Sequence, residues 1–291
     1  MAMLLDAMRE RARAGALYFV LSLGPCVGCA PALSSFTPAH VAPKGHVQAE
    51  LGLDVSVPTG AMGHVVDAGE ALSAAGDQRE LTREEQEQLL RSGAALLLNP
   101  PSATPHFGIA YTAWERIELN GRLSAGAIRL GARYQLLQQA KSGVDVSVGL
   151  GGARYAEEFP IGNQLSLLKV EGFTRWQLDL PLLVGRHENW YRVWAGPRVL
   201  FGFYDTGFKL EQPALPGVTN ERTVHASLDG VATYLGAQAG AAVGYKRVFL
   251  ALELTVAKLW TSSDLVVDGT LHELELDGAV VYPGVGLLFE F

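Results

Sequence analysis

Apolar and polar residues alternate with a period of two over much of the chain. From Val47 to Val57 every odd-numbered residue is apolar, and the residues between them are polar or glycine. The alternation returns over residues 173–184, with a register change after Phe173, and over residues 191–203. Because successive side chains of a strand point to opposite faces, each segment predicts a strand with one apolar and one polar face.

The same pattern predicts about ten strands in all, separated by turn signals. They lie at 47–57, 105–113, 117–124, 127–138, 144–155, 173–184, 191–203, 228–245, 248–261 and 279–291. Short turns and long loops alternate between them, apart from one tight link at 124–126. Within the long insert 58–104, Thr82 and Glu85 have the spacing of a capping box ahead of Leu89 and Leu90. This predicts one helix near 82–97.

The polar faces of these strands carry charges of both signs. The charged residues expected on them are Glu50, Asp54, Glu118, Arg122, Arg129, Arg133, Asp145, Arg175, Asp179, Arg192, Arg198, Glu253 and Glu290. Several strands exceed the roughly 5 to 6 residues usual in soluble sheets and suit the roughly 9 to 11 of tilted membrane strands. We therefore predict an antiparallel up-and-down transmembrane β-barrel of about ten strands with a polar lumen. A soluble sandwich or lipocalin-like barrel is the alternative.

The last predicted strand is apolar at alternate positions from Val281 to Phe291 and ends on an aromatic residue. With this ending, residues 45–291 resemble the bacterial outer-membrane β-barrel class; segments 42–48 and 129–135 also resemble barrel proteins of gliding bacteria. The resemblance implies that Phe289 and Phe291 form the signal read by the barrel-assembly machinery. It also implies outer-membrane lipid as a partner and the bacterial outer membrane as the location.

The N-terminus has the order of an export signal, with three arginines before the uncharged stretch 14–28. Two cleavage sites compete. The sequence Cys26-Val27-Gly28-Cys29 resembles a lipoprotein signal with Cys29 acylated, and residues 30–32, Ala-Pro-Ala, have the small-x-small pattern of ordinary signal peptidase. We expect a signal peptide over 1–29, acylation of Cys29, a periplasmic N-terminal segment over 30–44 held against the inner leaflet, and the barrel over 45–291.

Composition narrows the range of functions. Hydrophobic residues make up 48% of the 291 residues and charged residues 18%, which is too apolar for a disordered chain. The net charge of -7 and the lack of a long basic run argue against nucleic acid as a partner. The two cysteines both lie near the N-terminus, so neither a disulfide framework nor a four-cysteine zinc site is expected.

Candidate chemistry is sparse. The seven histidines are dispersed without an i, i+2 or i, i+4 pair, so we assign no metal and no cofactor. His225 and Ser227 resemble the His-x-Ser pair of outer-membrane lipid A deacylases, but the residues around them do not match that family. Asp264, Asp268 and His272 gather near one rim loop, without the Asp-x-His pairing of omptin proteases. We therefore expect no enzyme.

The charged lumen has two interpretations. It could be a salt-bridged network that seals the barrel, or a lining that selects small solutes. Since about eight strands leave an interior just filled by side chains, about ten should be nearly closed, and we favour the sealed network. We expect the 82–97 helix to cap the barrel from outside, with a lumen plug as the alternative. The leading function is a non-enzymatic barrel that binds partners or joins an envelope assembly; the alternatives are a narrow solute channel and, after it, a rim hydrolase.

Overall fold

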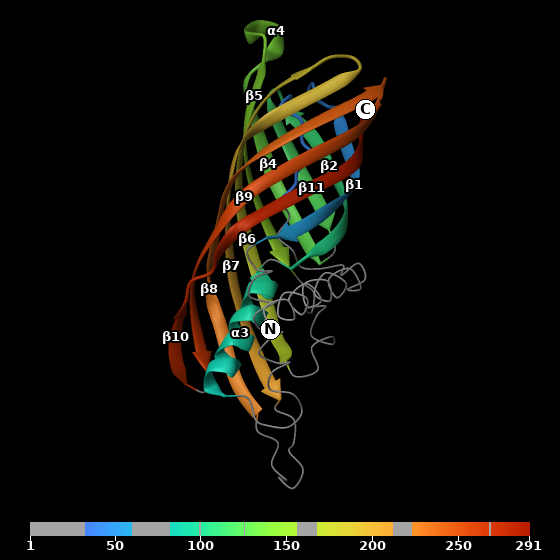
Figure 1. The fold of residues 1–291 in the computed structure, drawn as a ribbon. Helices are drawn as coiled ribbons and strands as arrows, with labels where there is room; N and C mark the ends of the chain where they lie inside the picture. The colour runs from blue at the N-terminus through green and yellow to red at the C-terminus, as the bar shows by residue number, and fades with distance from the viewer. Residues whose placement is uncertain are drawn as a thin grey trace, which may run out of the picture.

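The structure is a computed structural model that describes residues 33–59, 82–98, 100–124, 126–155, 168–211, 223–267 and 269–291. Strands and one long helix account for most of these residues (Figure 1). The elements are β1 (Val47–Pro58), α3 (Arg83–Leu98), β2 (Ser102–Trp114), β3 (Ile117–Ser124), β4 (Ala127–Leu137), α4 (Gln139–Ser142), β5 (Asp145–Tyr155), β6 (Leu168–His187), β7 (Tyr191–Glu211), β8 (Thr223–Tyr245), β9 (Val248–Val267), β10 (Thr270–Leu274) and β11 (Asp277–Glu290).

The sheet closes on itself, because β11 pairs with β1 and β8 pairs with β9, so that the order β10-β9-β11-β1-β2-β3-β4-β5-β6-β7-β8 joins at its ends. Every pairing is antiparallel. β8 covers one edge of β9, while β10 and β11 follow one another along its other edge. β10 and β11 therefore form a single strand of the wall that is interrupted at Glu275 and Leu276, so the eleven labelled strands make a barrel of ten. The predicted ten-stranded up-and-down barrel is confirmed.

The two ends of the barrel differ. The turns at 115–116, 188–190 and 246–247 lie at one end, together with the start of β1 and the end of β11, and we call this the turn end. The long connections lie at the other end, the loop end. There β6 to β9, of 20 to 23 residues, extend past β2 to β5, of 8 to 13 residues (Figure 1).

These long strands exceed their predicted lengths at the loop end because the polarity of their faces reverses there. Toward the turn end the outward residues of β9 are apolar, as at Leu254, and toward the loop end they are polar, as at Asp264. The inward residues change in the opposite sense, to buried Leu259 and Leu265. A strand that crosses from lipid to water exchanges its two faces, so a single alternating pattern ends at the boundary.

The outward face carries a belt of exposed apolar side chains, such as Leu252, whose exposed fraction is 60%. Exposed aromatic residues border this belt at both ends. They are Trp114, Tyr134, Trp190, Tyr245 and Phe291 at the turn end, and Trp176, Phe203 and Trp260 at the loop end. Leaving such a belt in water would cost roughly 25 cal/mol per Å², whereas a lipid-facing band between aromatic girdles suits a transmembrane barrel. The barrel therefore spans a membrane.

No helix among the described residues has the length and apolar character needed to cross a membrane.

Helix α3 begins at the predicted capping box, in which the Thr82 amide donates to Glu85 Oε2 over 2.8 Å and the Glu85 amide to Thr82 Oγ1 over 3.3 Å. Its buried leucines pack in one apolar cluster with inward residues of β7, β8 and β9. At its C-terminus, the carbonyl of Leu98 accepts hydrogen bonds from Arg175 and Tyr234, both buried. The helix lies inside the loop-end mouth, so the structure favours the plug over the external cap that we expected. The leucine-rich face of the helix is buried against the inner wall of the barrel.

Candidate functional site

The barrel lumen is the candidate functional site. All thirteen predicted charged residues lie on its wall, ten of them buried and Glu50, Arg129 and Glu290 partly buried. They comprise six arginines and seven carboxylates. The near balance of charge favours pairing within the wall, since an unpaired buried charge costs several kcal/mol.

Direct ion pairs link most of these groups, some between neighbouring strands and others across an intervening strand or the lumen. Arg122 Nη2 lies 2.5 Å from Asp54, and Arg133 Nη2 lies 2.7 Å from Glu118. Asp179 accepts from two arginines, with Arg198 Nε at 2.7 Å and Arg129 on its other oxygen. Two further arginine–carboxylate pairs are Arg122 with Glu50 at 3.6 Å and Arg192 with Glu290 at 2.6 Å.

The N-terminal segment runs inside the barrel. The sequence predicts that residues 30–44 lie outside it, on the periplasmic side, yet residues 33–42, here called the lumen segment, are buried in the lumen except for half-buried Thr37. Two glycines leave space for the segment. A Cβ at Gly284 would lie 2.6 Å from the Phe36 ring, and a Cβ at Gly185 would lie 2.9 Å from Ala39.

Wall side chains hold the backbone of the lumen segment. Arg122 donates to the Ser34 carbonyl over 2.6 Å, Arg198 donates to the Leu33 carbonyl, and Arg133 donates to the carbonyls of Pro38 and His40. In the opposite sense, the Ser35 amide donates to Glu253 over 2.7 Å and the Val41 amide to Gln135 over 3.1 Å. Arginine has five donors and no acceptor, so the carboxylates alone leave donors for which the segment supplies carbonyls.

The contacts give the direction in which the lumen segment runs. His40 lies beside Glu290, at the turn end of β11, whereas Phe36 lies beside Gly284, six residues further along the same strand. On β7, His40 is near Arg192 and the Leu33 carbonyl reaches Arg198, again six residues on. The end of the lumen segment with the higher residue numbers therefore lies at the turn end. From there the segment runs toward α3 as residue numbers decrease.

At the turn-end mouth the lumen segment meets a group of titratable side chains. His40 Nε2 lies 3.3 Å from Glu290, and its ring stacks on that of His187 with centroids 4.5 Å apart. His187 Nδ1 lies 2.6 Å from Asp145. Burial lowers the pKa of His40, against the opposing effect of Glu290. A cavity of about 190 Å³ opens beside these rings.

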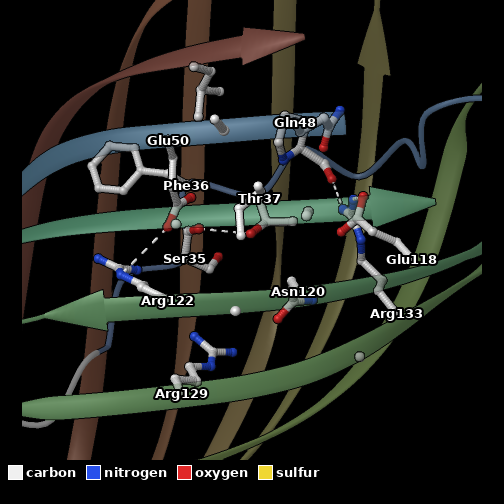
Figure 2. Close-up of a pocket in the computed structure, with 18 of the residues that line it drawn as sticks. Ser35, Phe36, Thr37, Gln48, Glu50, Glu118, Asn120, Arg122, Arg129 and Arg133 are labelled. Atoms are coloured by element: carbon white, nitrogen blue, oxygen red, sulfur yellow. Dashed lines mark hydrogen bonds and ion pairs between the residues drawn. The ribbon is translucent and has the colours of Figure 1, made fainter. Parts of the chain in front are cut away.

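A second cavity lies between the lumen segment and the wall of β1 to β5 (Figure 2). Its volume is about 60 Å³, and Glu50, Glu118, Arg122, Arg129 and Arg133 are among the residues that line it. Several of their polar atoms, including Glu118 Oε1 and Arg133 Nε, have no protein partner. A cavity of this size with donors and acceptors suits a few water molecules.

The other sequence candidates that the structure describes lie at the loop end, apart from the ion pairs of the lumen. His225 and Ser227 are on the outward face of β8, whereas His272 pairs with buried Leu265 of β9 and so lies on the inner face, next to the outward pair of Glu273 with Asp264. Asp268, the predicted signal peptide 1–29 and Cys29 lie outside the described residues. Within the described ranges, no group of three or more His, Cys, Asp or Glu side chains could hold a metal ion.

Phe289 and Phe291 lie at the seam where the barrel closes. Phe289 pairs in register with Ala49, and Val47 and Phe291 exchange two backbone hydrogen bonds of 3.0 and 2.8 Å. Their rings are parallel, 6.5 Å apart, and the Phe291 ring is exposed at the turn-end aromatic border.

Sequence reasoning missed the lumen segment. The available signal was the stretch 33–43, which apart from His40 contains no ionisable side chain and suits a buried backbone.

No protein-family model and no curated protein matches the sequence. Among solved structures, the N-terminal β-barrel domain of OprF from Pseudomonas aeruginosa aligns with 86% of this chain and 100% of its own, at 10% identity and a TM-score of 0.24. Neisserial surface protein A aligns with 84% of this chain and 96% of its own, at 9% identity and a TM-score of 0.29. A major outer membrane protein of Thermus thermophilus aligns with 84% of this chain and 99% of its own, at 9% identity and a TM-score of 0.33. Similarities this remote carry no functional argument.

The class follows from the geometry of the chain itself. A closed antiparallel barrel with a lipid-facing belt, two aromatic borders, a polar lumen, short turns at one end and long connections at the other is an outer-membrane β-barrel. The protein belongs to this class and resides in the bacterial outer membrane. In such barrels the turn end faces the periplasm and the loop end the exterior.

Proposed function

We propose that the protein is a closed, non-enzymatic outer-membrane barrel that binds a partner at its loop end as a component of an envelope assembly. The observation that carries the closed state is the occupied lumen. The lumen segment fills it from the turn end, α3 fills the loop-end mouth, and Leu33 meets α3 in one apolar cluster. Ion pairs of the wall occupy much of the remaining space.

Partner binding is supported by the protruding part of the wall. Strands β7, β8 and β9 continue beyond the aromatic border formed by Phe203 and Trp260, with polar residues outward and α3 packed inside. Crossing the membrane requires only about 9 to 11 residues per strand. The additional length therefore serves something other than insertion, and a rigid wall above the membrane suits a docking platform.

Recording from planar bilayers tests the closed state. The intact protein should show no steady conductance, and deletion of residues 34–41 should produce open events, because it removes the segment without removing a strand. A matched control, Asp205→Asn on the outward face of β7, should remain silent. Steady conductance of the intact protein would contradict the proposal.

Site-specific photo-crosslinking in intact cells tests partner binding. A crosslinking residue at position 229, outward on the protruding part of β8, should give a discrete protein adduct. The same residue at position 252, in the lipid-facing belt, is the control and should give none. Monomer alone at both positions would remove support for a partner at this wall.

A narrow solute channel is the second candidate, favoured by the cavities of about 60 and 190 Å³ beside the lumen segment. Large, stable and ion-selective events from the intact protein would favour this candidate.

A further inference from the structure

Residues 34–42 of the lumen segment are held through their main chain and form neither strand nor helix. Wall side chains from several strands bond to five of their backbone groups, namely the carbonyls of Ser34, Pro38 and His40 and the amides of Ser35 and Val41. Main-chain hydrogen bonds supply affinity for a peptide largely regardless of its side chains. The wall therefore presents a binding surface for a polypeptide backbone.

The barrel is closed without the lumen segment. β1 pairs with β11 and β2, and every other strand of the wall also has a paired neighbour on each side. Removing the segment breaks no bond between strands, but it takes the backbone partners from Arg122, Arg133 and Glu253. Since buried polar groups are costly without partners, an emptied lumen keeps a demand for another main chain.

Two positions of the lumen segment are selective for the side chain. Phe36 is buried in an apolar cluster with Trp194 and Phe249, and the missing Cβ of Gly284 leaves room for its ring. Ala39 packs against Gly185, another position without a Cβ. Apart from His40, residues 34–42 carry no ionisable side chain. The lumen thus fits a non-helical, uncharged peptide with an aromatic residue and, three positions later, a small one.

The lumen segment is tethered at the turn end, where it joins β1 through an exposed turn at 43–46. The His46 amide closes this turn on the Pro43 carbonyl over 3.1 Å, and Gly45 supplies the φ of 87° that the turn requires. Beside the tether lies the cavity of about 190 Å³, whereas α3 fills the loop-end mouth. A tether this short gives the segment a millimolar effective concentration, so it competes strongly with any free peptide.

We propose that the lumen is a receptor for a non-helical, uncharged segment of another protein, which enters from the turn end and replaces residues 34–42. This rests on the occupied lumen of the proposed closed state and adds a second partner, on the periplasmic side. The incoming main chain accepts from Arg122 and Arg133 and donates to Glu253, and its aromatic side chain fills the pocket of Phe36. The lumen segment is then a built-in competitor for this site.

Binding of a synthetic peptide of residues 34–42 to the full-length protein in detergent micelles tests the receptor. A fluorophore after Ala42 remains at the turn end and reports binding by anisotropy. Two variants weaken the competitor without changing the wall: Ala39→Leu overfills the space at Gly185, and Phe36→Ala empties the aromatic pocket. Each should bind the peptide at least about tenfold more tightly than the intact protein does. Lys44→Gln, at the exposed turn, is the matched control and should behave like the intact protein.

A peptide with the same residues in reverse order controls for adsorption to micelles. It should bind the two variants at least about tenfold more weakly, because its carbonyls and amides run in the opposite direction. Equal binding of both peptides would overturn the proposal. So would the absence of binding to both variants while their β9 amides stay protected from hydrogen exchange. Steady conductance of the intact protein, with specific binding of the peptide to the variants, would instead contradict only the closed state.

Discussion

At the scale of the residue, Asp179 connects two arginines in the ion-pair network of the lumen. It pairs with both Arg129 and Arg198, and Arg198 in turn holds the Leu33 carbonyl. Removing one partner from a buried ion pair is costly because the other charge stays in a poorly polarisable interior. A network built this way resists single substitutions less well than an apolar core of equal volume.

Asp179→Asn should therefore lower the free energy of unfolding by about 3 to 5 kcal/mol. Glu115→Gln, at an exposed turn between β2 and β3, is the control and should stay within about 0.5 kcal/mol. Urea unfolding from lipid vesicles measures both. Equal midpoints for the two variants would mean that the ion pairs of Asp179 contribute no stability.

Docking of the lumen segment should weaken at acid pH through His40. Burial lowers its pKa below the ordinary 6.5, so the docked state prefers the neutral ring and an undocked segment binds protons more readily. The stabilisation is complete above pH 6.5 and is lost as pH falls toward the lowered pKa. Protonation would also place charge beside His187 and Arg192, against the attraction of Glu290.

Hydrogen exchange of the Val41 amide, corrected for its intrinsic pH dependence, should therefore show reduced protection between pH 7 and 5 relative to amides of β9. His40→Gln should remove this pH dependence. The same loss of protection in His40→Gln would assign the effect to another group.

At the scale of the element, the protruding wall carries a row of like charges. Asp205 of β7 faces Asp229 of β8, Asp229 faces Asp264 of β9, and Asp264 faces Glu273 of β10. Directly opposite like charges destabilise a pair of strands by roughly 0.2 to 1 kcal/mol. The wall tolerates them because its inner face packs on α3.

Asp229→Asn should stabilise this wall, since it removes two of the three opposed pairs. We expect slower hydrogen exchange at the loop end of β8, with an effect that shrinks in high salt because exposed charges are screened. Asp277→Asn is the matched control and should give no gain, because Asp277 lies 3.9 Å from Lys258. Faster exchange in Asp229→Asn would indicate that the carboxylate row binds something stabilising.

At the scale of the whole molecule, the membrane sets the height of the barrel. On β6 the outward residues change at Trp176, from apolar Leu178 to polar Thr174. Leu178→Arg should impair assembly into vesicles, at a cost of about 2 to 4 kcal/mol near the midplane. Thr174→Arg, on the same face but beyond the aromatic border, should assemble normally. Equal assembly of both variants would place the hydrocarbon boundary elsewhere.

The sequence by itself determined the barrel. Side chains of a strand alternate strictly, so Leu51 and Leu53 face lipid and Asp54 faces the lumen whatever the neighbouring strands are. The capping box at Thr82 and Glu85 likewise acts within one turn of helix, and it predicted α3 correctly. The loop-end lengths of β7, β8 and β9 were missed, because the faces reverse where the strands leave the lipid.

Only the tertiary structure decided what fills the barrel. Which arginine pairs with which carboxylate depends on strand register, and the course of residues 33–42 depends on donors from several strands, such as Arg122, Arg133 and Arg198. No local pattern encodes such contacts, because partners like Leu33 and Arg198 are 165 positions apart. Short-range alternation along the chain determines the barrel wall. The position of the lumen segment, in contrast, depends on side chains that come together only after the barrel has closed.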